Sequence, residues 1–324
     1  MSREVVTSGR QVGDDQIGLG LFAALAGLSV AALLARRSHR EGARRETRAS
    51  DTHTIIAARR LNRAAGTLAF SVLFDSAIEH YRGSFHNKAM YTPLVVSSLA
   101  LAVSAHGLGD KRGEMHRFRH AIYIAAALTG AVGTGFHVYN VTKEPGGLAW
   151  QNLFYGAPLG APAAIALSGL LGATGERIRD TDRDKPPRVL GLPGGRFAAA
   201  IASLGLIGTT GEASLLHFRG AFHNPFMFLP VTLPPIAGLL LAETALGKKN
   251  RARWFTRWWV RLTAAMGFAG VGFHAYGVHR NMGGWRNWRQ NILNGPPLPA
   301  PPSFAGLALA GLAALTLFED HPDA

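Results

Sequence analysis

The octapeptides His80-Tyr-Arg-Gly-Ser-Phe-His-Asn87 and His217-Phe-Arg-Gly-Ala-Phe-His-Asn224 are two copies of one motif, related by a shift of 137 residues. The same shift aligns a second block, in which Gly130, Gly133, Gly135, Phe136, His137, Tyr139 and Val141 match Gly267, Gly270, Gly272, Phe273, His274, Tyr276 and Val278. At a shift of 139 a third block aligns Gln151, Asn152, Gly156, Pro158, Leu159, Ala161 and Pro162 with Gln290, Asn291, Gly295, Pro297, Leu298, Ala300 and Pro301. The chain is therefore an internal duplication, which decides its architecture.

The apolar residues of the chain are gathered into long runs. They make up 48% of the 324 residues, and the mean hydropathy is +0.10. Runs of about 20 residues with few charges are long enough to cross roughly 30 Å of hydrocarbon as helices. Nine such runs are predicted: 17–35, 64–81, 90–109, 120–141, 154–175, 197–218, 227–246, 259–278 and 301–319.

These runs predict an all-α polytopic membrane protein with one N-terminal helix followed by two tandem four-helix repeats. Because each repeat holds an even number of spans, the repeats are parallel and related by a pseudo-two-fold axis along the membrane normal. Five divisions are expected. Residues 1–63 hold an anchor helix with a basic cytoplasmic linker or surface helix, and residues 64–175 form the first repeat. A turn-rich linker (176–196), the second repeat (197–319) and a short tail (320–324) follow.

A net charge of +14 would suggest a nucleic-acid partner in a soluble protein, so the positions of the basic residues decide the interpretation. Of the 34 Lys and Arg residues, 25 lie in four alternate loops, 36–63, 110–119, 176–196 and 247–261. This asymmetry follows the positive-inside rule, so the partner is a lipid bilayer and not nucleic acid. It predicts a bacterial-type inner membrane with the N-terminus outside and the C-terminus in the cytoplasm.

All three repeated blocks then fall near the outer, periplasmic face. Each copy places two histidines at the outer ends of two helices, His80 with His137 and His217 with His274. Neutral imidazole is a common ligand of haem iron, so each pair predicts a haem b site. Arg82 and Arg219 would pair with the propionates. The glycines that share a helical face with the second histidine, Gly133 and Gly270 among them, would let a flat macrocycle approach the backbone.

Two other interpretations of the histidines stay open. His80, His86 and His137, with their counterparts His217, His223 and His274, would supply three nitrogens per copy to copper, iron or zinc. Asp75, the intramembrane acid matched by Glu212, lies about 140° around the helix from His80, which weakens it as a further ligand. Alternatively, the histidines cap helix C-termini, and the glycines serve close helix packing.

Three functional classes follow from these interpretations. The first is an electron-transfer membrane protein, such as the membrane subunit of an oxidoreductase, serving a periplasmic redox protein and quinone. The second is a protein that binds or transports an anion, because four proline-started helices point their N-termini at the outer site. The third is a non-catalytic anchor or assembly subunit. The chain lacks cysteine, which excludes thiolate chemistry, and no hydrolase motif is present.

Overall fold

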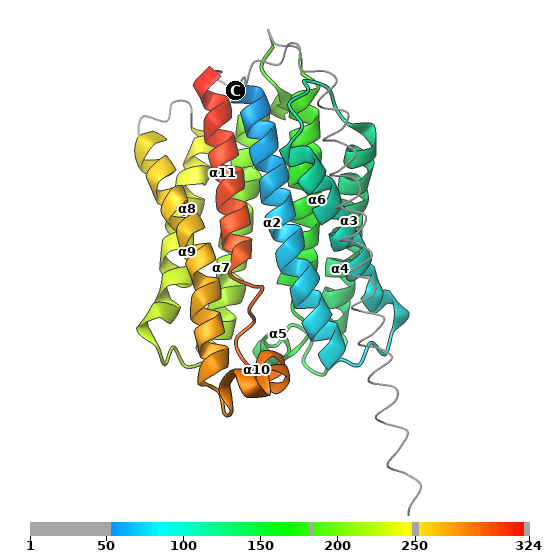
Figure 1. Cartoon of the computed structure of the whole chain (residues 1–324), viewed down its shortest axis with the longest axis vertical. Coiled ribbons are helices and arrows are strands. Elements are labelled where there is room, and N and C mark those ends of the chain that lie inside the picture. The colour runs from blue at the N-terminus through cyan, green and yellow to red at the C-terminus, as the bar shows by residue number, and fades with distance from the viewer. Residues whose placement is uncertain (1–52, 182–184, 248–252, 321–324) are drawn as a thin grey trace, which may run out of the picture.

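The computed structural model describes residues 53–181, 185–247 and 253–320. The first predicted span, 17–35, and the orientation of the N-terminus lie outside these residues. Within them the protein is almost entirely helical (Figure 1).

The two halves of the chain contain the same helices in the same order, except that the second half has one additional 3-10 helix, η3. Residues 53–179 form α2 (His53–Arg82), η1 (Lys88–Tyr91), α3 (Thr92–Leu108), α4 (Arg117–Thr142), α5 (Trp150–Tyr155) and α6 (Gly160–Arg179). Residues 194–320 form α7 (Gly194–Arg219), η2 (Pro225–Phe228), α8 (Leu229–Leu246), α9 (Arg253–Arg280), η3 (Gly284–Asn287), α10 (Trp288–Asn294) and α11 (Pro302–Asp320). Between them, β1 (Arg188–Val189) and β2 (Leu192–Pro193) form an antiparallel hairpin.

Eight helices coincide with the eight predicted apolar runs between 64 and 319, with two differences. Helix α2 begins at His53, so the expected linker over 53–63 is instead helical, because Ile55, Ala57 and Leu61 are buried against the rest of the bundle. The predicted run 154–175 is divided in two, since α5 ends at Tyr155 and α6 begins at Gly160.

The long helices pack in the same cyclic order in both halves. In the first half the contacts run α2–α3–α4–α6 and back to α2, and in the second half α7–α8–α9–α11 and back to α7. Helices α2 and α4 are therefore diagonal neighbours, as are α7 and α9. We call the end of the bundle where α2 begins the inner end and the end carrying the histidine motifs the outer end, following the predicted sidedness.

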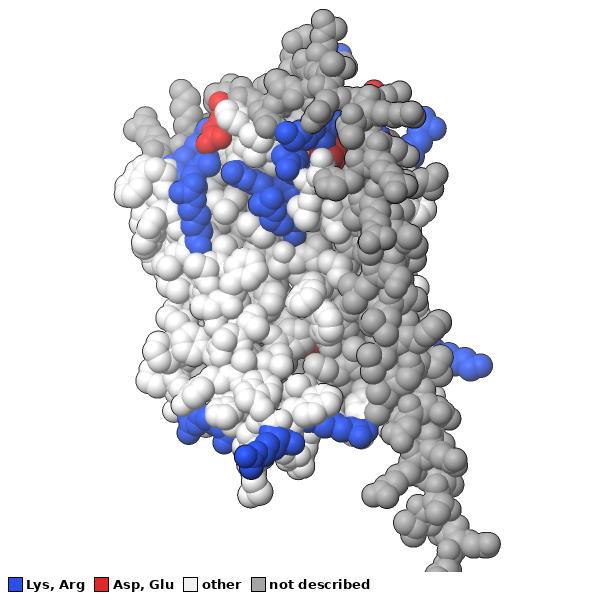
Figure 2. Space-filling view, viewed as in Figure 1, with Lys and Arg blue, Asp and Glu red and all other residues white. Residues whose placement is uncertain are grey.

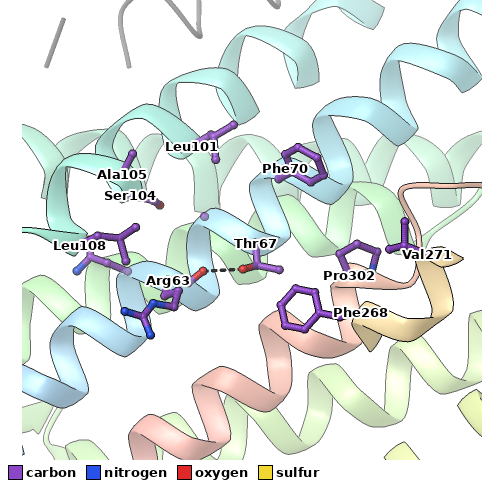
Figure 3. A pocket seen from close by; sticks show the side chains of 12 residues that line it. Arg63, Thr67, Phe70, Leu101, Ser104, Ala105, Leu108, Phe268, Val271 and Pro302 are labelled. Carbon is purple, nitrogen blue, oxygen red and sulfur yellow. Dashed lines mark hydrogen bonds between the residues drawn. The ribbon is translucent and has the colours of Figure 1, made fainter. Parts of the chain in front are cut away.

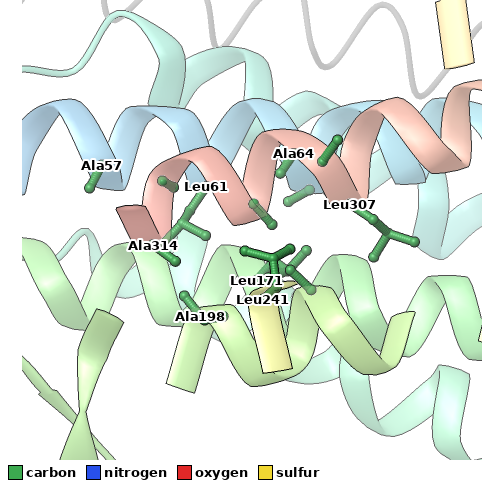
Figure 4. Close-up of a cluster of buried hydrophobic side chains, with 14 of the residues drawn as sticks. Ala57, Leu61, Ala64, Leu171, Ala198, Leu241, Leu307 and Ala314 are labelled. Carbon is green, nitrogen blue, oxygen red and sulfur yellow. The ribbon is translucent and has the colours of Figure 1, made fainter. Parts of the chain in front are cut away.

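One core joins the two halves. Most of it comes from α2, α6, α7 and α11, whose buried side chains are mostly alanine and leucine, such as Ala57, Leu61, Leu171, Ala198 and Leu307 (Figure 4). Small side chains let helices approach closely, which suits association where both surroundings and interior are apolar. Helices α3 and α4 flank this core on one side, and α8 and α9 flank it on the other (Figure 1).

Five of the described helical segments are long and apolar enough to cross a membrane: Lys88–Leu108, Arg117–Thr142, Gly194–Arg219, Pro225–Leu246 and Pro302–Glu319. Helices α2, α6 and α9 do not meet that criterion. On the face shown in Figure 2, blue groups nevertheless gather near both ends, and the middle of the face is largely white. The chain thus has the character of an all-α membrane protein.

Candidate cofactor site

The repeated octapeptide ends α2 and α7 with a tight turn. After Gly83, Ser84 and Phe85 take left-handed backbone angles, with φ of 58° and 44°, and the Phe85 amide donates to the carbonyl of His80 at 3.0 Å. Asn87 then accepts from the amide of Ala89 at 2.9 Å and so caps η1. The second copy builds the same turn, with Ala221 and Phe222 left-handed and Asn224 capping η2.

The third histidine of each copy belongs to this turn. The Nδ1 atom of His86 lies 3.0 Å from the carbonyl of Gly83, and that of His223 lies 2.9 Å from the carbonyl of Gly220. A carbonyl only accepts, so both rings donate to the end of the preceding helix. The capping interpretation thus describes these two histidines.

The other four histidines tie each helix to a neighbouring loop. The Nδ1 atoms of His80 and His217 lie 2.6 and 2.7 Å from the carbonyls of Met90 and Met227. Those of His137 and His274 lie 2.5 and 2.7 Å from the carbonyls of Pro158 and Pro297. Each ring must donate its Nδ1 proton, which leaves the Nε2 lone pair free of any partner among the described residues. This is the arrangement in which proteins commonly present a histidine to a metal.

The histidines of one copy come from diagonal helices and meet inside a four-helix unit. The rings of His217 on α7 and His274 on α9 lie with their centres 6.5 Å apart and their planes at 59°. His80 and His137 are within electrostatic reach of each other, but in the described structure their rings do not make the corresponding contact. Side chains that converge from facing helices are the usual way in which bundles build cofactor sites.

Ligand sets of three or more residues are not assembled. The described residues contain no group of three or more His, Cys, Asp or Glu that could hold a metal ion. Among these residues the geometry offers one close histidine pair, His217 with His274, and not the three-histidine set of His80, His86 and His137 or its counterpart.

The glycine faces are filled by neighbouring helices. A Cβ on Gly130 would lie 2.2 Å from the amide nitrogen of Ala166 on α6, and one on Gly267 would lie 2.6 Å from the equivalent Ala305 on α11. Gly133 and Gly270 face Pro162 and Pro301, whose Cβ atoms would be 3.2 and 2.7 Å away. Proline side chains of the neighbouring segments thus lie against both glycines, and their part in a macrocycle site stays a prediction.

The two motif arginines differ in their surroundings. Arg82 pairs with Glu79 at 2.8 Å, and both side chains are exposed. Arg219 stacks over the rings of Phe154 and Tyr155, at 5.6 and 5.2 Å from their centres. Both guanidinium groups lie at the outer end beside their histidines, but Arg82 is held by an ion pair and Arg219 by aromatic rings.

The intramembrane acids lie near each other between the two halves. Glu212 accepts from the amide of Gly160 at 3.2 Å, at the N-terminus of α6, and a Cβ on Gly160 would lie 1.5 Å from its carboxylate. Asp75 on α2 is within electrostatic reach of Glu212. The N-terminus of α6 is one of the four helix N-termini predicted to favour an anionic ligand, and it already binds the Glu212 carboxylate of the chain itself.

Sequence reasoning missed a buried ionic network at the inner end of the first half. Arg119 is fully buried and contacts both Glu176 and Asp110, at 2.9 and 2.8 Å. Arg179, also buried, donates to the carbonyls of Asp110 and Gly107 at 2.6 and 3.0 Å.

At the aligned positions of the second half, none of the four charges of this network is present. Asp110, Arg119, Glu176 and Arg179 correspond to Gly247, Thr256, Leu315 and Phe318. Aligning the repeats and asking where they differ would have revealed the network.

The positive charges around the Asp110 carboxyl favour its ionised state. Burial alone would raise the pKa of the Asp110 carboxyl, but the hydrogen bonds from Arg112 and the positive charge of Arg119 hold that pKa well below its usual range. The network thus fastens the α3–α4 connection to the end of α6 at neutral pH.

Comparison of the chain with protein-family models, with curated proteins and with solved structures found no significant match.

Proposed function

We propose that the chain is an electron-transfer membrane protein that holds one haem b at the outer end of each four-helix unit. His80 and His137 would hold the haem iron in the first unit, and His217 and His274 in the second. Bound haem b would supply reversible one-electron transfer. The partners under this proposal are a periplasmic redox protein and quinone.

One observation carries the proposal, namely the separation of the His217 and His274 rings. Two imidazoles that bind opposite sides of one metal ion at about 2 Å each place their ring centres roughly 6 Å apart. The observed 6.5 Å agrees with this requirement, while the Nδ1 hydrogen bonds leave both Nε2 atoms available. The donor set of the second unit therefore fits haem iron.

The same proposal includes the complete architecture. Nine transmembrane helices, of which 17–35 is the first, would place the histidine motifs outside and the C-terminus in the cytoplasm. The units 64–175 and 197–319 would be related by a pseudo-two-fold axis along the membrane normal. Matched contacts support this relation, since His80 and Met90 correspond to His217 and Met227, and Gly130 and Ala166 correspond to Gly267 and Ala305.

A visible absorption spectrum of the purified protein, with elemental analysis of the same sample, tests the function. We expect two low-spin haems per chain and iron in the same ratio. Stoichiometric copper or zinc without haem would favour a non-haem site instead. If neither haem nor metal is present, the histidines serve only to fasten the loops, and the electron-transfer proposal fails.

A further inference from the structure

A groove crosses the lateral surface of the bundle over α2. It has a volume of about 410 Å³ and an almost wholly apolar lining. Thr67 and Phe70 of α2 form its floor, Leu101 of α3 forms one wall, and Phe268 of α9 with Pro302 of α11 forms the other (Figure 3). Volumes of this size hold small ligands or parts of larger ones.

Arginines gather at one end of this groove. Arg63 lines it directly, and Figure 3 shows its guanidinium near Leu108, towards the inner end and away from Phe70. Arg60 lies within electrostatic reach of Arg63, Arg257 and Arg261. We call Arg60, Arg63 and Arg261 the arginine cluster. Basic side chains on this face extend from the inner end towards the middle of the bundle (Figure 2).

Two members of the cluster carry uncompensated charge. Arg63 and Arg261 are exposed, and no described residue makes a hydrogen bond or ion pair with either guanidinium. Arg60 donates to Thr316 and to the carbonyl of Leu312. The neighbouring acid, Glu319, is already engaged by Arg257 at 2.6 Å.

The aligned surface on the other side of the molecule lacks such a cluster. The residues that match Arg60, Arg63, Arg257 and Arg261 are Phe197, Ala200, His120 and Ile124. A general preference for basic residues at the inner face would act on both sides alike. The cluster is therefore a local feature that accompanies the groove.

We propose that this groove binds an acidic phospholipid of the inner leaflet. The phosphate of its headgroup would lie on the arginine cluster, and an acyl chain would lie along Thr67, Phe70 and Phe268. Arginine recognises phosphate oxygens well because its planar guanidinium donates two parallel hydrogen bonds. The apolar groove directly below the charges matches an amphiphile and not a free anion. The site does not depend on haem.

Native mass spectrometry of the delipidated full chain in detergent tests the proposal, with phosphatidylglycerol and phosphatidylcholine of identical acyl chains as probes. We expect one tightly bound phosphatidylglycerol and much weaker phosphatidylcholine. The double variant Arg63→Gln/Arg261→Gln should weaken phosphatidylglycerol binding by about thirtyfold, since each basic residue contributes roughly a factor of five at a membrane surface. Equal binding of the two lipids by the native protein would overturn the proposal.

The control variant Arg177→Gln/Arg188→Gln makes the same change of charge at exposed inner-end positions that lie outside the groove lining. It should leave binding within about twofold of the native value; an equal loss in both variants would show nonspecific attraction and refute the site. Thr67→Phe, which narrows the groove without a change of charge, should weaken a long-chain lipid but not a six-carbon one. Displacement of the lipid by millimolar inorganic phosphate would show that the cluster binds a free anion and overturn the lipid assignment.

Discussion

The rings of His217 and His274 face each other at 6.5 Å, although α7 and α9, which carry them, are diagonal in their four-helix unit and make no substantial contact. The space between diagonal helices is the interior of the unit, so the two rings meet there and not at a helix–helix seam. Each ring is oriented by a carbonyl from a loop, Met227 for one and Pro297 for the other. The second copy of the repeated blocks thus brings together four segments, namely α7, α9 and the two loops that carry Met227 and Pro297.

Replacement of single histidines tests this meeting point. His274→Ala and His137→Ala should each remove about half of the bound haem, because each variant deprives one unit of one of its two axial ligands. The measurement is haem per folded protein from the pyridine haemochrome spectrum.

His86→Ala serves as the matched control for these variants. Its ring donates to Gly83 and is exposed, so the haem content should not change. A loss as large as that of His137→Ala would indicate that His86 is a ligand and would contradict the pairwise assignment.

The glycine faces make a separate prediction about packing. Gly130→Ala places a methyl group 2.2 Å from the backbone of α6, so we expect it to lower the free energy of unfolding by about 1–3 kcal/mol through overpacking. Gly135→Ala, whose Cβ would meet nothing within 4 Å, should be neutral or slightly stabilising. Thermal unfolding in detergent compares them. Equal stability of the two variants would mean that α4 and α6 are not in this close contact.

The sidedness of the chain can be measured cleanly because it has no native cysteine. A membrane-impermeant maleimide applied to intact cells should label His86→Cys but not Glu114→Cys, which lies in the α3–α4 connection. Permeabilised cells should show labelling of both. Labelling of position 114 in intact cells would reverse the orientation derived from the basic loops.

The pH dependence of stability should include a contribution from His116, the N-cap of α4. Burial and the charges of Arg119 and Arg112 lower the pKa of its imidazole, and its Nδ1 accepts from the amide of Arg119. As pH falls below about 6.5, the unfolded chain binds this proton before the folded one does, so the free energy of unfolding decreases.

His116→Asn keeps an N-cap acceptor and removes the titration. The variant should therefore lose less thermal stability than the native protein between about pH 7 and pH 5. If the variant and the native protein lose the same thermal stability between these two pH values, His116 does not contribute to the pH dependence. Asp110, whose folded pKa is also depressed, acts in a lower window, below about pH 4.

The positions of the long helices followed from the sequence because apolar composition alone decides which segments avoid water. Seven of the eight runs between 64 and 319 are single helices and the run 154–175 is divided between α5 and α6, while the repeated blocks lie together at one end. The starts and breaks of elements were less predictable. Helix α2 extends back to His53 through an arginine-rich stretch, since Ile55 and Leu61 find buried positions that only tertiary packing could supply.

The roles of individual polar residues depended on geometry that spacing does not contain. His86 and His80 belong to the same octapeptide, yet one closes its turn and the other reaches the loop at Met90. The glycines beside His137 were compatible with either a cofactor or a helix, and the structure places α6 against them. The Lys and Arg residues of 110–119 and 176–196 supported the topology as a group, while two of them, Arg119 and Arg179, are in fact buried partners of acidic residues.

That buried network provides the strongest test of the inner end. Arg119→Met would leave Glu176 without its closest partner in a dry site, so we expect a loss of about 3–5 kcal/mol in the free energy of unfolding. The double variant Arg119→Met/Glu176→Met removes one charge of each sign. Arg179, which also lies 3.6 Å from Glu176, keeps its hydrogen bonds to the carbonyls of Asp110 and Gly107. The double variant should recover most of that loss, because apolar side chains can replace a buried ion pair at little cost. The second half, with Thr256 and Leu315 at these places, already packs without the pair. Chemical denaturation in detergent measures all three proteins, and additive losses in the double variant would show that Arg119 and Glu176 do not act as a pair.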